Sequence, residues 1–190
     1  MLETLRQLDQ DLFLYLNGIH NSFWDKVMYQ VSGRFIWAPL YLFIIFLFIQ
    51  KFKAKSFIPI LGAILLIVLS DQLSVHLFKN VFERLRPCRA PEIKNMVHLV
   101  RDHCGGLYGF ISSHAANTFA LAVFSSLLLR KRLFSFGIFV WAAWVSYSRI
   151  YLGVHYPGDV IVGALFGVLL GVLLYLSIKR VFKKYMLSAD

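Results

Sequence analysis

Five long hydrophobic runs constrain this chain more than any other feature of its sequence. They cover residues 35–50, 56–78, 112–129, 133–148 and 160–178. Each run is close to the roughly 20 residues that an α-helix needs to cross a bilayer. With 58% hydrophobic and only 16% charged residues, the chain is too apolar for an ordinary water-soluble domain. The sequence therefore predicts an all-α, polytopic membrane helix bundle with five transmembrane helices.

Residues 1–34 precede these runs and have a different pattern. Apolar side chains recur there at helical spacing, at Leu5, Leu8, Leu12, Leu16 and Ile19. Asn17-Gly18 weakens this first helix, and Ser22 with Asp25 resembles a capping box that opens a second one. We expect two amphipathic interfacial helices rather than a signal peptide, because the start of the chain is acidic. No linker or repeat divides residues 1–190, so we expect one membrane domain.

Positive charge marks one end of the predicted bundle. Segments 51–55, 130–132 and 179–184 together hold ten Lys and Arg residues and no acidic residue. Five crossings place all three segments on one face, which the positive-inside rule makes cytoplasmic. The net charge of +10 then reflects membrane topology and not nucleic-acid binding. We expect a bacterial inner-membrane protein with its N-terminus outside, its C-terminus in the cytoplasm, and loops 79–111 and 149–159 on the periplasmic face.

Three groups of polar residues lie in or beside these two periplasmic loops. They are Lys79 with Arg86, then Ser112, Ser113 and His114, and then Arg149, His155 and Asp159. Each group alone also fits an interfacial charge cluster or a helix cap. Their joint placement on one membrane face favours a site instead, because cations and helix N-terminal N–H groups together bind a tetrahedral oxyanion.

The two histidines suggest the chemistry of such a site. Asp159 follows His155 by four residues, so its carboxylate can accept the Nδ1 proton and leave Nε2 as a nucleophile. His114 can then protonate the leaving oxygen. This set of groups fits phosphoryl transfer.

The same residues closely resemble the three-part signature of the type 2 phosphatidic acid phosphatase family, which also includes the vanadium haloperoxidases. The matching motifs span residues 79–159 and read Lys79-x6-Arg86-Pro87, Ser112-Ser113-His114, and Ser148-Arg149-x5-His155-x3-Asp159. The middle motif departs from the family pattern, because Ile111 and Ser113 stand where the family usually has Pro and Gly.

The resemblance implies a role for each matching residue. It makes His155 the nucleophile, Asp159 its orienting carboxylate and His114 the general acid. It implies a phosphohistidine intermediate, and neither a metal nor another cofactor. The residues that it assigns to phosphate binding are Lys79, Arg86, Ser112, Ser113 and Arg149.

We therefore expect a metal-independent membrane phosphatase that cleaves a phosphomonoester or diphosphate from a lipid headgroup. Phosphatidylglycerophosphate, phosphatidate, undecaprenyl diphosphate and a lipid A phosphate all remain possible substrates. The expected partners are the lipid phosphate and the bilayer, with no nucleic acid and no obligate protein partner. The alternative is a small transporter or channel that uses Asp71 and His76 of the second run as an ion path, which explains the helices but not the paired motifs.

Cys88 and Cys104 are the only cysteines, and both lie in loop 79–111. Thiols outside the cytoplasm are oxidised in a bacterial periplasm or a comparable compartment. Closing a loop of this size is worth about 3 kcal/mol in the chain-entropy model. We predict a disulfide that holds Arg86 in register with Ser112 and His114.

Overall fold

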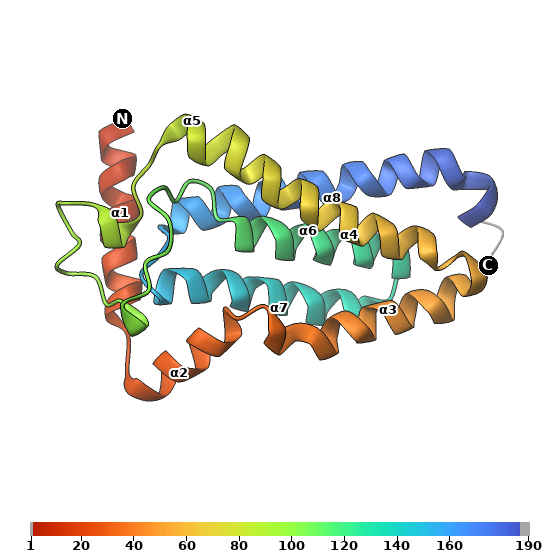
Figure 1. The fold of residues 1–190 in the computed structure, drawn as a ribbon, viewed down its shortest axis with the longest axis horizontal. Coiled ribbons are helices and arrows are strands. Elements are labelled where there is room, and N and C mark those ends of the chain that lie inside the picture. The colour runs from red at the N-terminus through yellow and green to blue at the C-terminus, as the bar shows by residue number, and fades with distance from the viewer. Residues whose placement is uncertain (1, 187–190) are drawn as a thin grey trace.

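The molecule is a bundle of helices that run side by side, with one further helix lying across one end (Figure 1). The computed structural model describes residues 2–186, and within them it contains no β-strand. The bundle helices are α3 (Ala38–Phe52), α4 (Phe57–Leu73), α6 (Ser113–Leu129), α7 (Arg132–Tyr151) and α8 (Pro157–Met186). The predicted all-α membrane bundle is confirmed.

Four helical segments within 2–186 are long and apolar enough to cross a membrane. They are Phe35–Lys55, Phe57–Phe82, Arg132–Tyr151 and Pro157–Arg180. The remaining predicted crossing is α6, whose 17 residues rise about 25 Å. Twelve residues of α6 are buried, so this helix is surrounded by protein and its length need not match the lipid. Much of the outer surface of the bundle is apolar and exposed, as expected for a surface that faces acyl chains.

Helix α8 packs closely against α6 along a row of glycines. Gly163, Gly167 and Gly171 recur every four residues and so lie on one face of α8. A Cβ atom at Gly167 would lie 2.2 Å from the carbonyl oxygen of Ala116, and one at Gly163 would lie 2.6 Å from that of Ser112. Small residues at such positions let two membrane helices bring their backbones together. The row therefore sets the distance between the N-terminal ends of the two helices.

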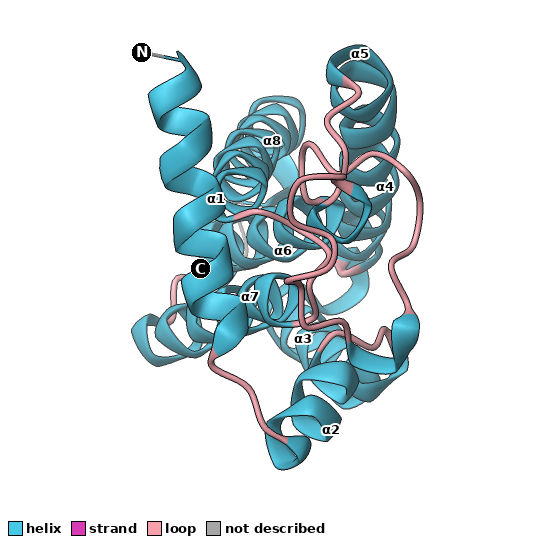
Figure 2. Cartoon of the chain, turned by 90° about the vertical axis from the view of Figure 1, so that its left-hand side faces the viewer, coloured by secondary structure: helices cyan, strands magenta, loops and turns pink. Residues whose placement is uncertain are grey.

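The helix across the end of the bundle is α1 (Leu2–Gly18), and a bend connects it to α2 (Ser22–Val31). In Figure 2, which looks onto this end, α1 and the loops lie over the ends of the bundle helices. Most of the predicted leucine stripe of α1 is exposed, with Leu5 and Leu8 close to 60% accessible, whereas Leu16 is partly buried against the protein. A second face docks on the protein, where Phe13 and Asn17 are buried. This arrangement supports an interfacial helix with its leucines toward lipid.

Helix α2 begins with a different cap from the predicted one. The side chain of Asn21 accepts hydrogen bonds from the backbone N–H groups of Phe23 and Trp24, at 3.1 and 2.9 Å. Ser22 is already the first helical residue, so the predicted capping box of Ser22 with Asp25 is wrong. Asn caps a helix as well as Ser does, and it stands one position earlier here.

Replacing Gly167 by Ala should destabilise the protein by about 1–3 kcal/mol, the usual cost of overpacking. The physical reason is the collision of the new Cβ with the backbone of α6. The measurement is the thermal unfolding midpoint of the purified protein in micelles. Gly137→Ala in α7 is the matched control, because no atom beyond its own stretch of helix lies within 4 Å of the Cβ position there. Equal midpoints for the two variants would contradict the α6–α8 contact.

Candidate active site

The third motif lies where the chain turns from α7 into α8. His155 and Asp159 are 2% and 0% exposed. Nδ1 of His155 lies 3.4 Å from Oδ2 of Asp159, and its Nε2 lies 3.3 Å from Nη1 of Arg86. The same Oδ2 accepts the backbone N–H of Tyr156 at 3.1 Å. A proton on Nδ1 therefore faces the carboxylate, and the Nε2 lone pair faces a cation.

The surroundings of His155 keep its ring neutral. Burial lowers the pKa of His155 well below its usual value, and the positive charges of Arg86, Arg149 and Lys79 lower it further. A neutral imidazole keeps its lone pair, whereas a protonated ring has none to offer. The arrangement thus suits a nucleophile that acts at neutral pH.

Lys79 is placed by an irregular segment at the end of the second crossing. α4 continues as a π-helical stretch, Ser74–Lys79, and then as the single turn α5 (Asn80–Phe82). π-Helical turns are rare in proteins, and many of those that occur lie at functional sites. Nζ of Lys79 donates a hydrogen bond to Oγ of Ser113 at 2.7 Å, which joins the first motif to the second.

The second motif forms the N-terminus of α6. Ser112 is the N-cap, and its backbone N–H donates to the carbonyl oxygen of Asp159 at 3.0 Å. Oγ of Ser113, at the position that departs from the family pattern, lies 2.6 Å from Oγ of Ser74. The hydroxyl of Ser113 is thus held between Ser74 and Lys79, which is how this chain accommodates a side chain there.

Two guanidinium groups complete the cationic surroundings, that of the buried Arg86 and that of the half-buried Arg149. Nη1 of Arg86 also donates to the carbonyl oxygen of Val154 at 3.1 Å, and Nη1 of Arg149 donates to Oγ of Ser32. Among the described residues, Nε of Arg86 and Nε of Arg149 have no hydrogen-bond partner. Buried donors of this kind are rarely left unpaired, so both groups have N–H donors to offer an oxyanion.

A cavity of about 580 Å³ lies beside this cluster, between α3, α4, α6 and α7. Its size is within the roughly 300–1,000 Å³ of typical ligand pockets. Its walls are mostly apolar, and the polar residues that line it include His114, Asn117 and Asp71. Ile64 and Val68 also line it while being more than half exposed, so the cavity reaches the outer surface of the bundle.

The two residues of the transporter alternative do not form a path. Asp71 lines the cavity, whereas His76 is exposed on the π-helical stretch. The predicted catalytic and phosphate-binding residues, in contrast, all lie at one end of the bundle.

Several residues of this region were missed by the sequence analysis. Ser74 and Ser32 contact site residues, and Arg84 donates to Oδ1 of Asp159 at 2.8 Å. Asp9 of α1 accepts from the same arginine at 2.7 Å. Nothing in the spacing of these residues separates them from an interfacial charge cluster or an ordinary polar face.

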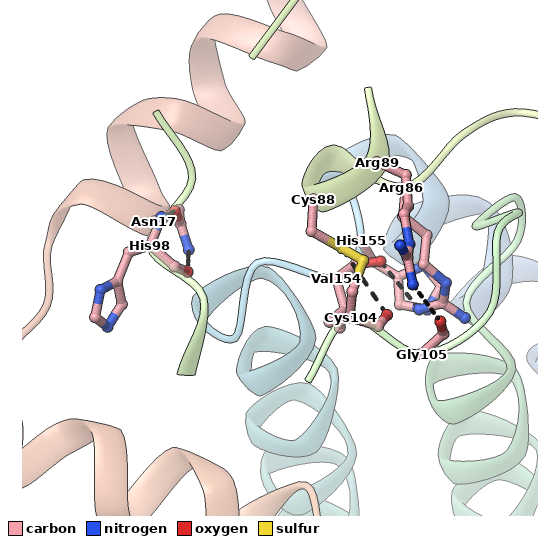
Figure 3. Close-up of a disulfide and its surroundings, with 9 residues drawn as sticks. All are labelled: Asn17, Arg86, Cys88, Arg89, His98, Cys104, Gly105, Val154 and His155. Carbon is pink, nitrogen blue, oxygen red and sulfur yellow. Dashed lines mark hydrogen bonds between the residues drawn. A yellow bond between two sulfur atoms is a disulfide. The ribbon is translucent and has the colours of Figure 1, made fainter. Parts of the chain in front are cut away.

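A disulfide between Cys88 and Cys104 closes the long loop, with the two Cα atoms 6.0 Å apart. Figure 3 shows it beside Arg86 and His155. Next to the bridge, the backbone N–H of Arg86 donates to the carbonyl oxygen of Leu107 at 3.2 Å. The disulfide and this hydrogen bond together fix the position of Arg86. A fixed position is expected for a residue that binds an anion, because less entropy is then lost on binding.

Three comparisons relate the chain to known proteins. A family model described as the PAP2 superfamily matches residues 60–183. The lipid A 4'-phosphatase of Bacteroides thetaiotaomicron is 42% identical over 178 residues, which cover 92% of this chain and 79% of that protein. The protein of the same name from Porphyromonas gingivalis is 37% identical over 175 residues, or 92% and 74% of the two chains.

The fold has a solved counterpart. The crystal structure of a transmembrane PAP2-type phosphatidylglycerolphosphate phosphatase from Bacillus subtilis superposes with a TM-score of 0.72. The match covers 93% of this chain and 87% of the other, at 23% sequence identity. It supports the fold alone.

The disulfide should be detectable on the purified protein by intact-mass analysis. Alkylation without reductant should add no label, and alkylation after reduction should add two. Replacing both cysteines by Ser should lower the free energy of unfolding by about 3 kcal/mol, because the denatured chain regains its loop entropy. Cys88→Ser alone is the control, since it should expose one reactive thiol without reductant. Two labels on the unreduced wild-type protein would contradict the bridge.

Proposed function

Because this chain belongs to the PAP2 superfamily and is a membrane lipid phosphatase of that type, we propose that it removes the 4'-phosphate of lipid A. The observation that carries the substrate assignment is the match to two lipid A 4'-phosphatases across 92% of the chain, at 42% and 37% identity. The cavity beside His114 supports it, because its apolar walls suit acyl chains and its polar residues suit a headgroup.

The proposed reaction has two steps. Lys79, Arg86 and Arg149 bind the phosphate, and Nε2 of His155 attacks phosphorus while the bond to the sugar oxygen breaks. The leaving oxygen takes a proton from the imidazolium form of His114, whose positive charge the bound phosphate oxyanion stabilises. Water then cleaves the phosphohistidine, releases inorganic phosphate and returns a proton to His114. The contacts of Nδ1 with Asp159 and of Nε2 with Arg86 support this assignment.

The remaining assigned residues assist the phosphate. Ser112 offers its hydroxyl group, and Ser113 and His114 offer their backbone N–H groups, at the start of α6, where the helix dipole favours an anion. Metal independence remains a prediction, and among the described residues no group of three or more His, Cys, Asp or Glu side chains could hold a metal ion.

We further propose that the site faces the extracytoplasmic side of a bacterial inner membrane. The basic turns 51–55 and 130–132 lie at the end of the bundle opposite α1 and the long loop (Figure 1), as the positive-inside rule requires for this orientation. The disulfide supports the same orientation, because a bridge in that loop is stable on an oxidising side.

A panel of lipid phosphates in mixed micelles tests the substrate. We expect inorganic phosphate release from lipid A to exceed that from phosphatidylglycerophosphate, phosphatidate and undecaprenyl diphosphate by about tenfold in kcat/KM. Mass spectrometry of the product should show that the 4' position has lost its phosphate. The assay contains excess chelator, so it also tests metal independence. A faster reaction with another lipid of the panel would replace the substrate, and loss of activity in chelator would overturn the metal-free mechanism.

The two histidines should differ in their response to the leaving group. His155→Ala should abolish phosphate release from every substrate, because no nucleophile remains. His114→Ala should slow lipid hydrolysis by about 10²–10⁴-fold but spare nitrophenyl phosphate, whose leaving oxygen needs little protonation. The measurement is the single-turnover rate of leaving-group release for each variant on both substrates, because His114 also takes a proton from water in the second step. Equal losses of His114→Ala on both would refute its role as general acid.

A further inference from the structure

Arg84 connects the buried carboxylate of Asp159 to the helix that lies across the end of the bundle. Its Nη1 donates to Oδ1 of Asp159 at 2.8 Å, and its Nη2 donates to Oδ2 of Asp9 in α1 at 2.7 Å. The guanidinium carbon also lies 4.0 Å from the ring centroid of Tyr156. The side chains of Arg84, Asp9 and Asp159 are 27%, 16% and 0% exposed, so the bridge is largely shielded from water.

Asp9 uses its other oxygen to hold the start of α8. Oδ1 of Asp9 accepts the backbone N–H of Gly158 at 2.7 Å. A Cβ atom on Gly158 would lie 2.8 Å from Oδ2 of Asp9, so the carboxylate approaches the backbone closer than any side chain would allow. One carboxylate of α1 therefore contacts both Arg84 and the residue that precedes Asp159.

The position of α1 is fixed at a second point, two helical turns beyond Asp9. Nδ2 of Asn17 donates to the carbonyl oxygen of Tyr151 at 2.8 Å, and its Oδ1 accepts the backbone N–H of His98 at 2.8 Å. These bonds hold α1 to the end of α7 and to the long loop. Asp9 is thus presented from a helix that is itself held in place.

The carboxylate of Asp159 needs its contact with Arg84 in order to serve His155. Oδ2 faces Nδ1 of His155, and Oδ1 has Arg84 as its partner. A buried carboxylate that loses its cation tends to take up a proton or to turn toward another donor. Either change would leave His155 without its acceptor at Nδ1.

We propose that Arg84 and Asp9 are positioning residues that clamp the Asp159 carboxylate against His155, so that helix α1 forms part of the catalytic centre. This inference rests on the proposed roles of His155 and Asp159. The simpler alternative is that the bridge only docks α1 and leaves the chemistry unaffected. The two differ in what happens to turnover and to its pH dependence.

The charge at Arg84 should set the acid limb of the pH profile. Burial acts to lower the pKa of Arg84, but Asp159 and Asp9 outweigh it and raise that pKa, so the group is charged throughout the working range. The other charged or titratable groups described as acting on Asp159 are Arg86, Lys79, His155 and Tyr156. Without Arg84, Asp159 binds a proton more readily and does so at higher pH. Activity that depends on the ionised carboxylate should then be lost at higher pH as the solution is acidified.

The experiment compares variants on the lipid phosphate that wild type hydrolyses fastest. Arg84→Gln should lower kcat by about 10- to 100-fold with KM within about twofold, and should move the acid limb of kcat/KM to higher pH. Arg84→Lys keeps the charge but not the two-armed geometry, so its acid limb should stay near that of wild type while kcat falls less. A fraction of enzyme that is misfolded at every pH lowers kcat but leaves the pH limb in place, and circular dichroism at each pH identifies a variant that unfolds in acid.

Asp9→Asn tests the contribution of α1. It should lower kcat by about tenfold, because Arg84 and the start of α8 lose a common anchor. Asp11→Asn is the matched control, since Asp11 lies on the same helix, is exposed and contacts only Gln7 among the hydrogen bonds described for it. The combined Asp9→Asn and Arg84→Gln variant should lose less than the product of the two single losses, because both changes break one linkage.

Two outcomes would overturn the inference. One is an Arg84→Gln enzyme with kcat within twofold of wild type, and the other is a lower kcat with an unmoved acid limb, which would make the bridge a docking contact only. Failure of the proposed function is separate and is recognised by a His155→Ala variant that retains activity.

Discussion

The backbone contact between α6 and α8 is the constraint on which the rest of the site depends. Gly167 lets α8 approach the carbonyl of Ala116 so closely that a side chain would not fit. The approach brings two helix N-termini together, tied by the hydrogen bond from Ser112 to the carbonyl of Asp159. His114 follows one of these ends and His155 precedes the other, so the packing of the two helices determines where the two histidines lie relative to each other.

Positive charge then accumulates where these ends meet. Two helix dipoles point their positive ends at the same region, and Lys79, Arg86 and Arg149 add three cations to it. Holding like charges together is unfavourable, and an oxyanion among them relieves the repulsion. The same charges keep His155 neutral, so one electrostatic arrangement both attracts phosphate and maintains the lone pair that would attack it. Arg84 offsets the negative charge of Asp159, so the carboxylate does not cancel the positive field of the three cations.

The sequence predicted the bundle because lipid-facing helices require continuous apolar runs, and it predicted the motif residues because their order and spacing are specific. It could not predict how α1 docks, since Asp9, Phe13 and Asn17 mix a charge, an aromatic ring and an amide on one face. Hydrophobic periodicity identifies the leucine stripe of α1 but not its docking face, because that face is not uniformly apolar. The glycine row of α8 is visible in the sequence, but its partner helix is not, so its role emerges only from the packing.

Predictions from local sequence rules failed at positions where tertiary contacts determine the structure. Asn21, and not Ser22, is the N-cap of α2. Asp25 does not cap the helix and instead accepts a hydrogen bond from the hydroxyl of Tyr151 at 2.7 Å. The π-helical stretch that ends at Lys79 has no signal in composition, because its residues would also suit a regular helix. The role of Arg84 could not be predicted for a different reason. The loop contains several arginines, and the sequence does not distinguish them until the partners of each are known.

The exposed side chains at the rim of the cavity bear on the route by which a lipid substrate enters it. Ile64 and Val68 face both the cavity and the hydrocarbon around the bundle, so a lipid can arrive by diffusion within the leaflet and need not leave it. The quantity that governs occupancy is then the mole fraction of substrate among neighbouring lipids rather than its bulk concentration. Inert lipid or detergent added at constant bulk substrate should dilute the substrate in two dimensions, and its alkyl chains should compete for the same apolar walls.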